Sequence, residues 1–153
     1  MPSTFSQIYI QIVLAVRNRE CVIHPSWEEE LYKYITGIVK KKDQHLLAIN
    51  GMPDHIHFLI RIRPSCSLSD LMREVKKSTN EFINESKFTK HKFYWQEGYG
   101  AFSYSQYEVD KIINYIKNQK EHHMKKSFKA EYLSLLHDFQ IEFKDEYLFE
   151  WIE

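Results

Sequence analysis

Two histidines stand one residue apart in the segment GMPDHIHFLI, residues 51–60. Because successive side chains of a β-strand point to opposite faces, His55 and His57 would share one face, while Ile56 and Phe58 would turn to the other. Two neutral imidazoles side by side on a strand can bind one divalent metal ion. The same spacing also occurs in strands whose histidines bind nothing. The pair therefore predicts a metal site only if a third ligand lies nearby.

Candidate partners lie in the segment SQYEVDKIINYIKNQKEHH, residues 105–123. At 100° per residue, Tyr115, Gln119 and His122 fall within about 60° of one another on a helix and flank its apolar stripe. A Gln oxygen is an adequate hard ligand for Mg²⁺ or Mn²⁺. A tyrosine one turn earlier could bring its hydroxyl to a phosphate that the metal polarises. The chain has ten tyrosines, so a purely structural role for Tyr115 stays open.

Hydrophobic periodicity indicates the elements that would position these residues. It predicts strands over residues 7–16, two more within 45–62 joined by a tight connection at 51–54, and a short one within 92–105. It predicts helices over residues 24–42, 67–86, 105–123 and 127–137. The first six elements run strand-helix-strand-strand-helix-strand, the ferredoxin-like order. The expected fold class is α/β in the broad sense (α+β), an antiparallel sheet flanked by helices, with an added helix that carries Tyr115.

Composition and charge limit the classes of protein. With 153 residues, 43% of them hydrophobic, the chain is predicted to form one domain. Two cysteines make neither a disulfide framework nor a metal motif, and no segment has the apolar character of a signal peptide or a membrane span. A cytoplasmic protein is the expectation. The net charge is zero, but residues 131–153 hold one Lys against seven acidic residues, so a basic body would carry an acidic tail.

The two motifs together resemble a known family. HIH at residues 55–57 matches the HUH motif, in which U is an apolar residue, and YIKNQ at residues 115–119 matches Tyr-x-x-x-Gln on the following helix. The segments MPDHIHFLI and WQEGYGAFS agree as well. Over roughly residues 5–125, the chain resembles the single-tyrosine HUH transposases of the insertion sequence 200/605 class and the related REP-associated tyrosine transposases.

The resemblance implies a mechanism and partners. His55, His57 and Gln119 would hold Mg²⁺ or Mn²⁺, and Tyr115 would attack a phosphodiester of single-stranded DNA to leave a 5′-phosphotyrosine and a 3′-hydroxyl. The substrate would carry an imperfect hairpin at the element end. The protein would be a homodimer in which the tyrosine helix of one subunit often completes the histidine site of the other. His123, one turn beyond Gln119, is a candidate further metal ligand or phosphate contact.

The family pattern also indicates where this chain differs. Many relatives have His at the position of Gln11, a change that would alter a neighbour of the site without removing a metal ligand. Residues 1–126 would form the transposase domain, and the helical, acidic residues 127–153 would be a C-terminal extension of the same domain.

Basic and aromatic residues predict where DNA would bind. Charges can follow phosphates while rings stack on bases. Residues 88–107 hold eight aromatic residues, although Phe93, Trp95 and Phe102 could equally belong to the core. The candidate phosphate contacts are Arg61, Arg63, Lys76, Lys77, Lys90 and Lys92.

Three other functions fit some of the same residues. A replication initiator or relaxase would nick DNA by the same chemistry, but such proteins generally carry further domains. A nucleic-acid-binding module, such as a domesticated transposase, would bind without a covalent product. A metal-dependent hydrolase would need a carboxylate base, and Asp54 is expected to face away from the histidines.

Overall fold

Four strands form one antiparallel sheet in the computed structural model, which describes residues 3–152. They are β1 (Ile8–Ala15), β2 (His45–Met52), β3 (His55–Ile62) and β4 (Gly100–Tyr104). Their order is β2-β3-β1-β4, and all three pairings are antiparallel. This is the ferredoxin-like arrangement, so the predicted fold class is confirmed.

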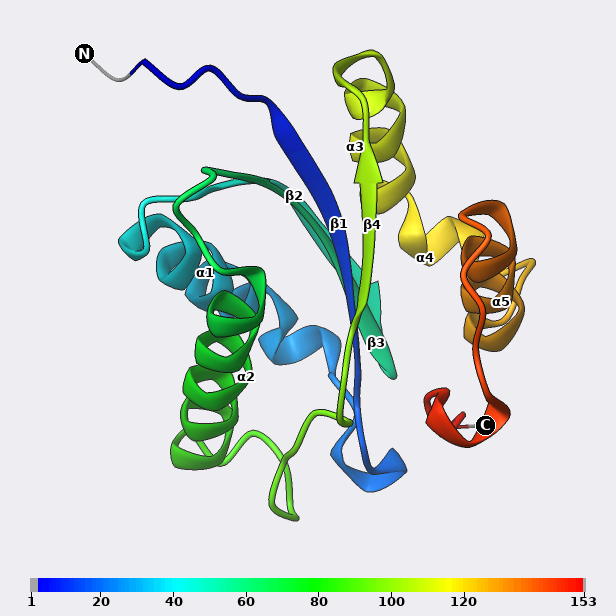
Figure 1. The fold of residues 1–153 in the computed structure, drawn as a ribbon. Helices are drawn as coiled ribbons and strands as arrows, with labels where there is room; N and C mark the ends of the chain where they lie inside the picture. The colour runs from blue at the N-terminus through cyan, green and yellow to red at the C-terminus, as the bar shows by residue number, and fades with distance from the viewer. Residues whose placement is uncertain (1–2, 153) are drawn as a thin grey trace.

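Helices cover both faces of the sheet (Figure 1). One layer consists of α1 (Pro25–Lys41) and α2 (Leu68–Glu85). The other layer consists of α3 (Val109–Lys117), α4 (Gln119–His122) and α5 (Phe128–Asp138). Within residues 3–152, no helix is long and apolar enough to cross a membrane.

The alternation of β3 assigns its side chains to the two layers. Ile56, Phe58 and Ile60 lie in the large apolar cluster beneath α1 and α2. Leu59 packs with the apolar face of α3 on the opposite side. His55 and His57 share the face of Leu59 because they are an even number of residues away from it, so the histidine pair lies under the layer of α3, α4 and α5.

The connection between β2 and β3 is shorter than predicted. The turn comprises only Pro53 and Asp54, and Gly51 remains within β2. A Cβ atom on Gly51 would lie 2.3 Å from the backbone oxygen of His55. The absence of a side chain thus lets the two strands approach closely where β3 begins.

The predicted helix over residues 105–123 is divided. A 3₁₀ turn at Gln106–Glu108 precedes α3, and Asn118 separates α3 from α4 with ψ of 19°. Asparagine is a weak helix former. Asn50 on β2 also donates a hydrogen bond of 2.8 Å from its Nδ2 atom to the Lys117 carbonyl at the break. The predicted helix is therefore present in two pieces, with Tyr115 in α3 and Gln119 at the start of α4.

Candidate metal and tyrosine site

Three histidines converge in a buried cluster between the sheet and α5. His55 and His57 come from β3, and His123 follows α4. Their Nε2 atoms lie 3.4, 2.9 and 3.0 Å, respectively, from Oε1 of Glu131 on α5. One ligand atom from each of these four residues lies within 4.8 Å of all the others. The cluster therefore has the donor types and the spacing of a metal site.

Each of the three imidazoles is oriented by a second hydrogen bond. Nδ1 of His55 lies 2.7 Å from Oδ1 of Asp54, and Nδ1 of His57 lies 2.8 Å from Oε1 of Gln11. Nδ1 of His123 lies 2.7 Å from the backbone oxygen of Lys126. When each Nδ1–H donates to these acceptors, every Nε2 keeps a lone pair that points into the cluster.

Asp54 differs from the prediction that it faces away from the histidines. It lies in the two-residue turn and not within the strand, so strand alternation does not apply to it. Its carboxylate instead contacts Nδ1 of His55, on the side of the ring that faces away from the cluster. Asp54 thus orients this imidazole, while Glu131 is the carboxylate at the centre of the cluster.

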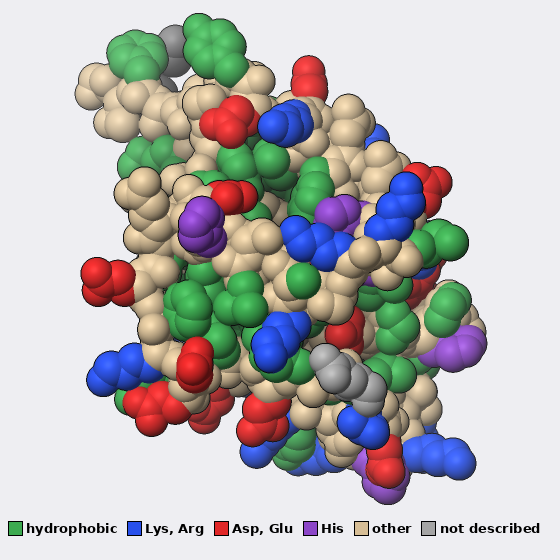
Figure 2. Space-filling model, turned by 90° about the vertical axis from the view of Figure 1, so that its right-hand side faces the viewer, with side chains coloured by type: hydrophobic (Ala, Val, Ile, Leu, Met, Phe, Trp, Pro, Cys, Tyr) green, Lys and Arg blue, Asp and Glu red, His purple; other side chains and the backbone are tan. Residues whose placement is uncertain are grey.

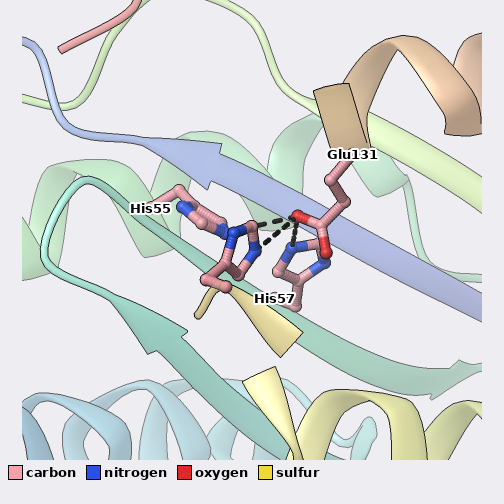
Figure 3. Close-up of side chains that lie close together, drawn as sticks. His55, His57 and Glu131 are labelled. Carbon is pink, nitrogen blue, oxygen red and sulfur yellow. Dashed lines mark hydrogen bonds and ion pairs between the residues drawn. The ribbon is translucent and has the colours of Figure 1, made fainter. Parts of the chain in front are cut away.

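Glu131 is the residue of this cluster that the sequence reasoning missed. Its side chain is 2% exposed, and Figure 3 shows it reaching from its helix toward His55 and His57. A signal was present in the sequence, because Glu131 follows Phe128 by three residues and precedes Leu135 by four, on the apolar side of the helix. A carboxylate on a buried helix face needs polar partners, and it finds them in the histidines.

The two residues of the Tyr-x-x-x-Gln motif reach the same carboxylate. The Tyr115 hydroxyl donates a hydrogen bond to Oε2 of Glu131, and Nε2 of Gln119 donates to the same oxygen at 3.1 Å. Oε1 of Gln119 points the other way, 3.4 Å from Nε2 of His55 and 3.0 Å from Nε2 of His123. The structure thus brings Tyr115, Gln119 and the histidines of one chain together.

Burial and the neighbouring charges set the ionisation of the cluster. Burial opposes protonation of His55, but its hydrogen bonds to Asp54 and Glu131 outweigh that effect, and its pKa is raised. At His57 burial prevails over the attraction of Glu131, and the pKa is lowered. Burial would raise the pKa of Glu131, yet the nearby histidines hold it well below its usual value. The site thus contains an ionised carboxylate and a neutral imidazole, the forms in which these groups bind metal.

The tyrosine hydroxyl is protonated in this arrangement. Burial, the charge of Glu131 and the hydrogen bond to it all raise the pKa of Tyr115 above the ordinary value of a phenol. His122, at the end of α4, lies beside this tyrosine, with the ring centroids of the two residues 5.2 Å apart. Nε2 of His122 is 3.5 Å from Oε2 of Glu131, so it lies at the edge of the cluster.

Two pockets open beside the cluster. One, of about 480 Å³, is lined by Tyr115, Glu131, Lys111 and Lys126 among others. The second, of about 330 Å³, lies on the side of His123 and also includes Lys126. Figure 2 shows Lys or Arg side chains beside a partly exposed histidine on the face formed by α3, α4 and α5. Basic groups therefore lie in the same pocket as Tyr115, where they could bind an anion.

The predicted DNA contacts lie elsewhere, for the most part. Lys76 and Lys77 are on α2, which covers the sheet face opposite the histidines. Lys76 is half-buried, and its Nζ donates to the backbone oxygens of Gln96, at 2.8 Å, and of Gly98. It is therefore engaged within the fold, while Lys77 is exposed.

The other predicted basic residues are exposed. Arg61 shares the histidine face of β3 at the far end of the strand, and Arg63 lies 3.5 Å from Asp43. Lys90 and Lys92 lie in the connection before β4. The structure brings none of these four residues into the cluster.

The aromatic residues before and within β4 belong mainly to the core. Phe93, Trp95 and Phe102 are at most 5% exposed, so their rings pack against protein and are not free to stack on bases. Tyr94 and Tyr107 are exposed. Of the two roles considered for the first three rings, the structure shows the core role.

Comparison with known proteins now identifies the family. Residues 4–119 match the family described as "Transposase IS200 like". The chain belongs to the IS200-like transposase family. A search of curated proteins finds no match. Membership places the chain among the DNA transposases and confirms the resemblance seen in the sequence.

Two solved structures share the fold of this IS200-like transposase. One is a candidate transposase from Deinococcus radiodurans R1, with a TM-score of 0.61, 18% identity, and coverage of 78% of this chain and 95% of that chain. The other is a REP-associated tyrosine transposase bound to a REP hairpin, with a TM-score of 0.59, 16% identity, and coverage of 80% of this chain and 73% of that chain.

The family match ends within the observed site. It includes His55, His57, Tyr115 and Gln119, its last residue, whereas the other cluster residues, His123 and Glu131, follow it. The structure thus adds the partly buried His123 and the buried Glu131, both from the C-terminal part of this transposase, to the residues of the family motifs.

Proposed function

We propose that this transposase cleaves and rejoins single-stranded DNA through a 5′-phosphotyrosine on Tyr115, with a divalent metal ion held by His55, His57 and Gln119. The observation that supports this function is the convergence of the Tyr115 hydroxyl and three histidine Nε2 atoms on one buried carboxylate. A nucleophile and a metal site would thus act on the same phosphate.

The residues of the cluster fit a divalent cation. Three imidazole nitrogens and a carboxylate oxygen lie together, and the Gln119 amide oxygen lies 3.4 and 3.0 Å from two of those nitrogens. Hydrogen bonds at each Nδ1 orient the imidazoles. This mixed nitrogen and oxygen set suits Mn²⁺ and accommodates Mg²⁺ less readily. His123 is proposed as the additional ligand. A bound ion would act as a Lewis acid toward the scissile phosphate.

The side chains account for the remaining steps. The Tyr115 oxygen forms the new bond to phosphorus as the bond to the 3′ oxygen breaks, and the proton lost by the phenol is matched by one gained at the 3′-hydroxyl. Lys111 and Lys126, which line the pocket at Tyr115, would bind the phosphate oxygens. Attack by a 3′-hydroxyl on the phosphotyrosine reverses the step and rejoins the strands.

Hairpin-containing ends of insertion sequences are the proposed substrate. A protein with the same fold is bound to a REP hairpin, and family membership makes DNA the expected partner. The homodimer stays a prediction. Because Tyr115 meets the histidines of its own chain, a composite site between subunits is not required for the cluster to form.

Residues 127–153 are proposed to extend the transposase domain of residues 1–126. Phe128, Tyr132 and Phe149 from this segment pack in one apolar cluster with Val13 of β1 and Phe102 of β4. An extension that shares the core of the sheet folds with it, which fits a single domain.

A covalent DNA adduct tests the proposed function. Labelled single-stranded hairpins from the flanks of the gene are incubated with wild type, Tyr115→Phe or Tyr107→Phe, with Mn²⁺ or with EDTA, and resolved on a denaturing gel. We expect a slow, protease-sensitive band from wild type and from Tyr107→Phe, which changes an exposed tyrosine. Tyr115→Phe and EDTA should reduce that band to background.

The other outcomes separate the rival functions. Cut DNA without an adduct would indicate hydrolysis at the metal site. Tight binding with neither product would indicate a non-catalytic module. An adduct formed by Tyr115→Phe would assign the nucleophile to another tyrosine and contradict the proposal.

A further inference from the structure

Glu131 occupies the position between the histidines and the tyrosine. Its two oxygens face different groups. Oε1 lies within 3.4 Å of the Nε2 atoms of His55, His57 and His123. Oε2 accepts hydrogen bonds from the Tyr115 hydroxyl and from Gln119. One carboxylate therefore contacts both halves of the site.

The position of Glu131 in the fold makes this arrangement specific to the extension. Glu131 lies on α5, after the last residue of the family match. Ser127 caps that helix by accepting a hydrogen bond from the Ala130 N–H, and the Phe128 ring stacks on His55 with centroids 3.7 Å apart. The start of α5 is thus fixed against the histidine strand, which places Glu131 over the cluster.

We propose that Glu131 links the metal to the nucleophile: Oε1 is a metal ligand added to the histidines, and Oε2 positions the Tyr115 hydroxyl beside the metal. This inference rests on the proposed function and deepens it. Glu131 is thereby a metal ligand and a positioning residue for Tyr115, and α5 is part of the catalytic centre.

The geometry favours this role over that of a simple buried ion pair. An ion pair needs one cation, whereas Glu131 faces three imidazoles that already have other partners at Nδ1. Burial of a carboxylate is unfavourable unless its oxygens are bonded. Oε1 faces the three Nε2 atoms that would bind a metal ion together with it, while Oε2 accepts a hydrogen bond from the hydroxyl that has to react. A change at one oxygen is therefore transmitted to the other through a single rigid group.

Metal binding and the state of Tyr115 are measured without DNA. Mn²⁺ affinity is determined by electron paramagnetic resonance for wild type, Glu131→Gln, Glu131→Asp and the control Glu142→Gln, which changes an exposed residue of the tail. We expect Glu131→Gln to weaken Mn²⁺ binding by at least about tenfold, because a charged ligand is lost from an oriented site. Glu142→Gln should match wild type, and Glu131→Asp should recover part of the affinity because it retains the charge.

The link to the tyrosine has its own signal. Each protein is labelled with 3-fluorotyrosine, and the resonance absent from Tyr115→Phe is assigned to Tyr115. Addition of Mg²⁺, which is diamagnetic, should shift that resonance in wild type and in Glu142→Gln. The shift should be lost in Glu131→Gln, whose melting temperature is measured to show that it remains folded. A merely structural role for Glu131 would leave the metal-dependent shift in place.

Two results would overturn the inference. Unchanged Mn²⁺ affinity in both Glu131 variants would exclude the carboxylate as a ligand. A metal-dependent Tyr115 shift that persists in Glu131→Gln would exclude the link to the nucleophile. Should Glu131→Gln fail to fold, both measurements are made on Glu131→Asp. This variant should lose part of the Mn²⁺ affinity and part of the Tyr115 shift, and full retention of both would contradict the inference. Adduct formation by wild type decides the proposed function separately, so failure of one is distinguishable from failure of the other.

Discussion

At the scale of single residues, Gln11 shows how one side chain connects two parts of the site. Its Oε1 accepts from Nδ1 of His57 at 2.8 Å, and its Nε2 donates to the Tyr104 hydroxyl at 2.7 Å. Gln11 itself is fully buried. It therefore holds the imidazole of His57 in the orientation that leaves Nε2 free for the proposed metal ion.

Loss of the Gln11 amide should weaken the metal site without removing a ligand. For Gln11→Leu we expect Mn²⁺ affinity to fall by about 10–100-fold, as is typical when a hydrogen bond to a ligating histidine is removed. Titration calorimetry with Mn²⁺ measures the effect. Gln7→Leu, which changes an exposed glutamine immediately before β1, is the control. Equal affinities for Gln11→Leu and wild type would show that Gln11 does not orient His57.

At the scale of elements, the sheet follows from the sequence, whereas the closing of the site does not. Alternation around His55 and His57 indicates their shared face, and that face is what the structure shows. The sequence predicts Gly51 in the turn, but it lies in β2, where the backbones of β2 and β3 come close. Turn propensities do not take account of such a contact between strands. Packing of α5 brings Glu131 to the histidines, and this contact cannot be predicted from the local sequence. The local sequence predicts only that a glutamate lies on the apolar face of a helix.

The break at Asn118 illustrates the same limit in a helix. The periodicity of residues 105–123 indicates one helix, and the motif spacing suffices to bring Tyr115 and Gln119 together. The bond from Asn50 to the Lys117 carbonyl comes from a different element. A contact of this kind depends on the register of β2 beneath α3, which only the assembled fold defines.

A pair of glycine substitutions tests the close approach of β2 and β3. In Gly51→Ala the new methyl group would meet the backbone of His55, so the strands must shift, and we expect a loss of about 1–3 kcal/mol in unfolding free energy. Gly37→Ala on α1 meets nothing within 4 Å and should stabilise the protein by about 0.5–1 kcal/mol. Urea unfolding measures both. A Gly51→Ala protein as stable as wild type would show that the hairpin is not constrained there.

At the scale of the whole molecule, the acidic tail is folded onto the body. Gln96 before β4 donates from Nε2 to the Glu150 oxygen, and Glu150 donates its N–H to Oε1 of Gln96, both at 2.7 Å. Figure 1 shows the tail returning toward the sheet after α5. Phe149 lies in the apolar cluster with Tyr132, so the tail and α5 close the same side of the molecule. The charge asymmetry of the sequence thus belongs to one packed unit and not to a separate acidic segment.

This packing should make the protein less stable as the pH rises into the alkaline range. Burial raises the pKa of Tyr132 from 10.0 to about 12. Burial also raises the pKa of Tyr104 to about 12, against the lowering effect of its bond from Gln11. A group whose pKa is higher in the folded state gives its full stabilisation below the pKa of the unfolded chain. That contribution is lost as the pH rises through the folded-state value, here between about pH 10 and pH 12.

Tyr132→Phe should remove one part of this dependence. In that range, each buried tyrosine lowers the free energy of unfolding by up to about 1.4 kcal/mol for each unit by which the pH rises. Between about pH 10 and pH 11, the free energy of unfolding of Tyr132→Phe should therefore fall by roughly 1 kcal/mol less than that of wild type. Urea unfolding across this range measures the slopes, and Tyr107→Phe, which alters an exposed side chain, should keep the wild-type slope. Equal slopes for Tyr132→Phe and wild type would mean that water reaches the Tyr132 hydroxyl and that α5 opens from the sheet before the protein unfolds.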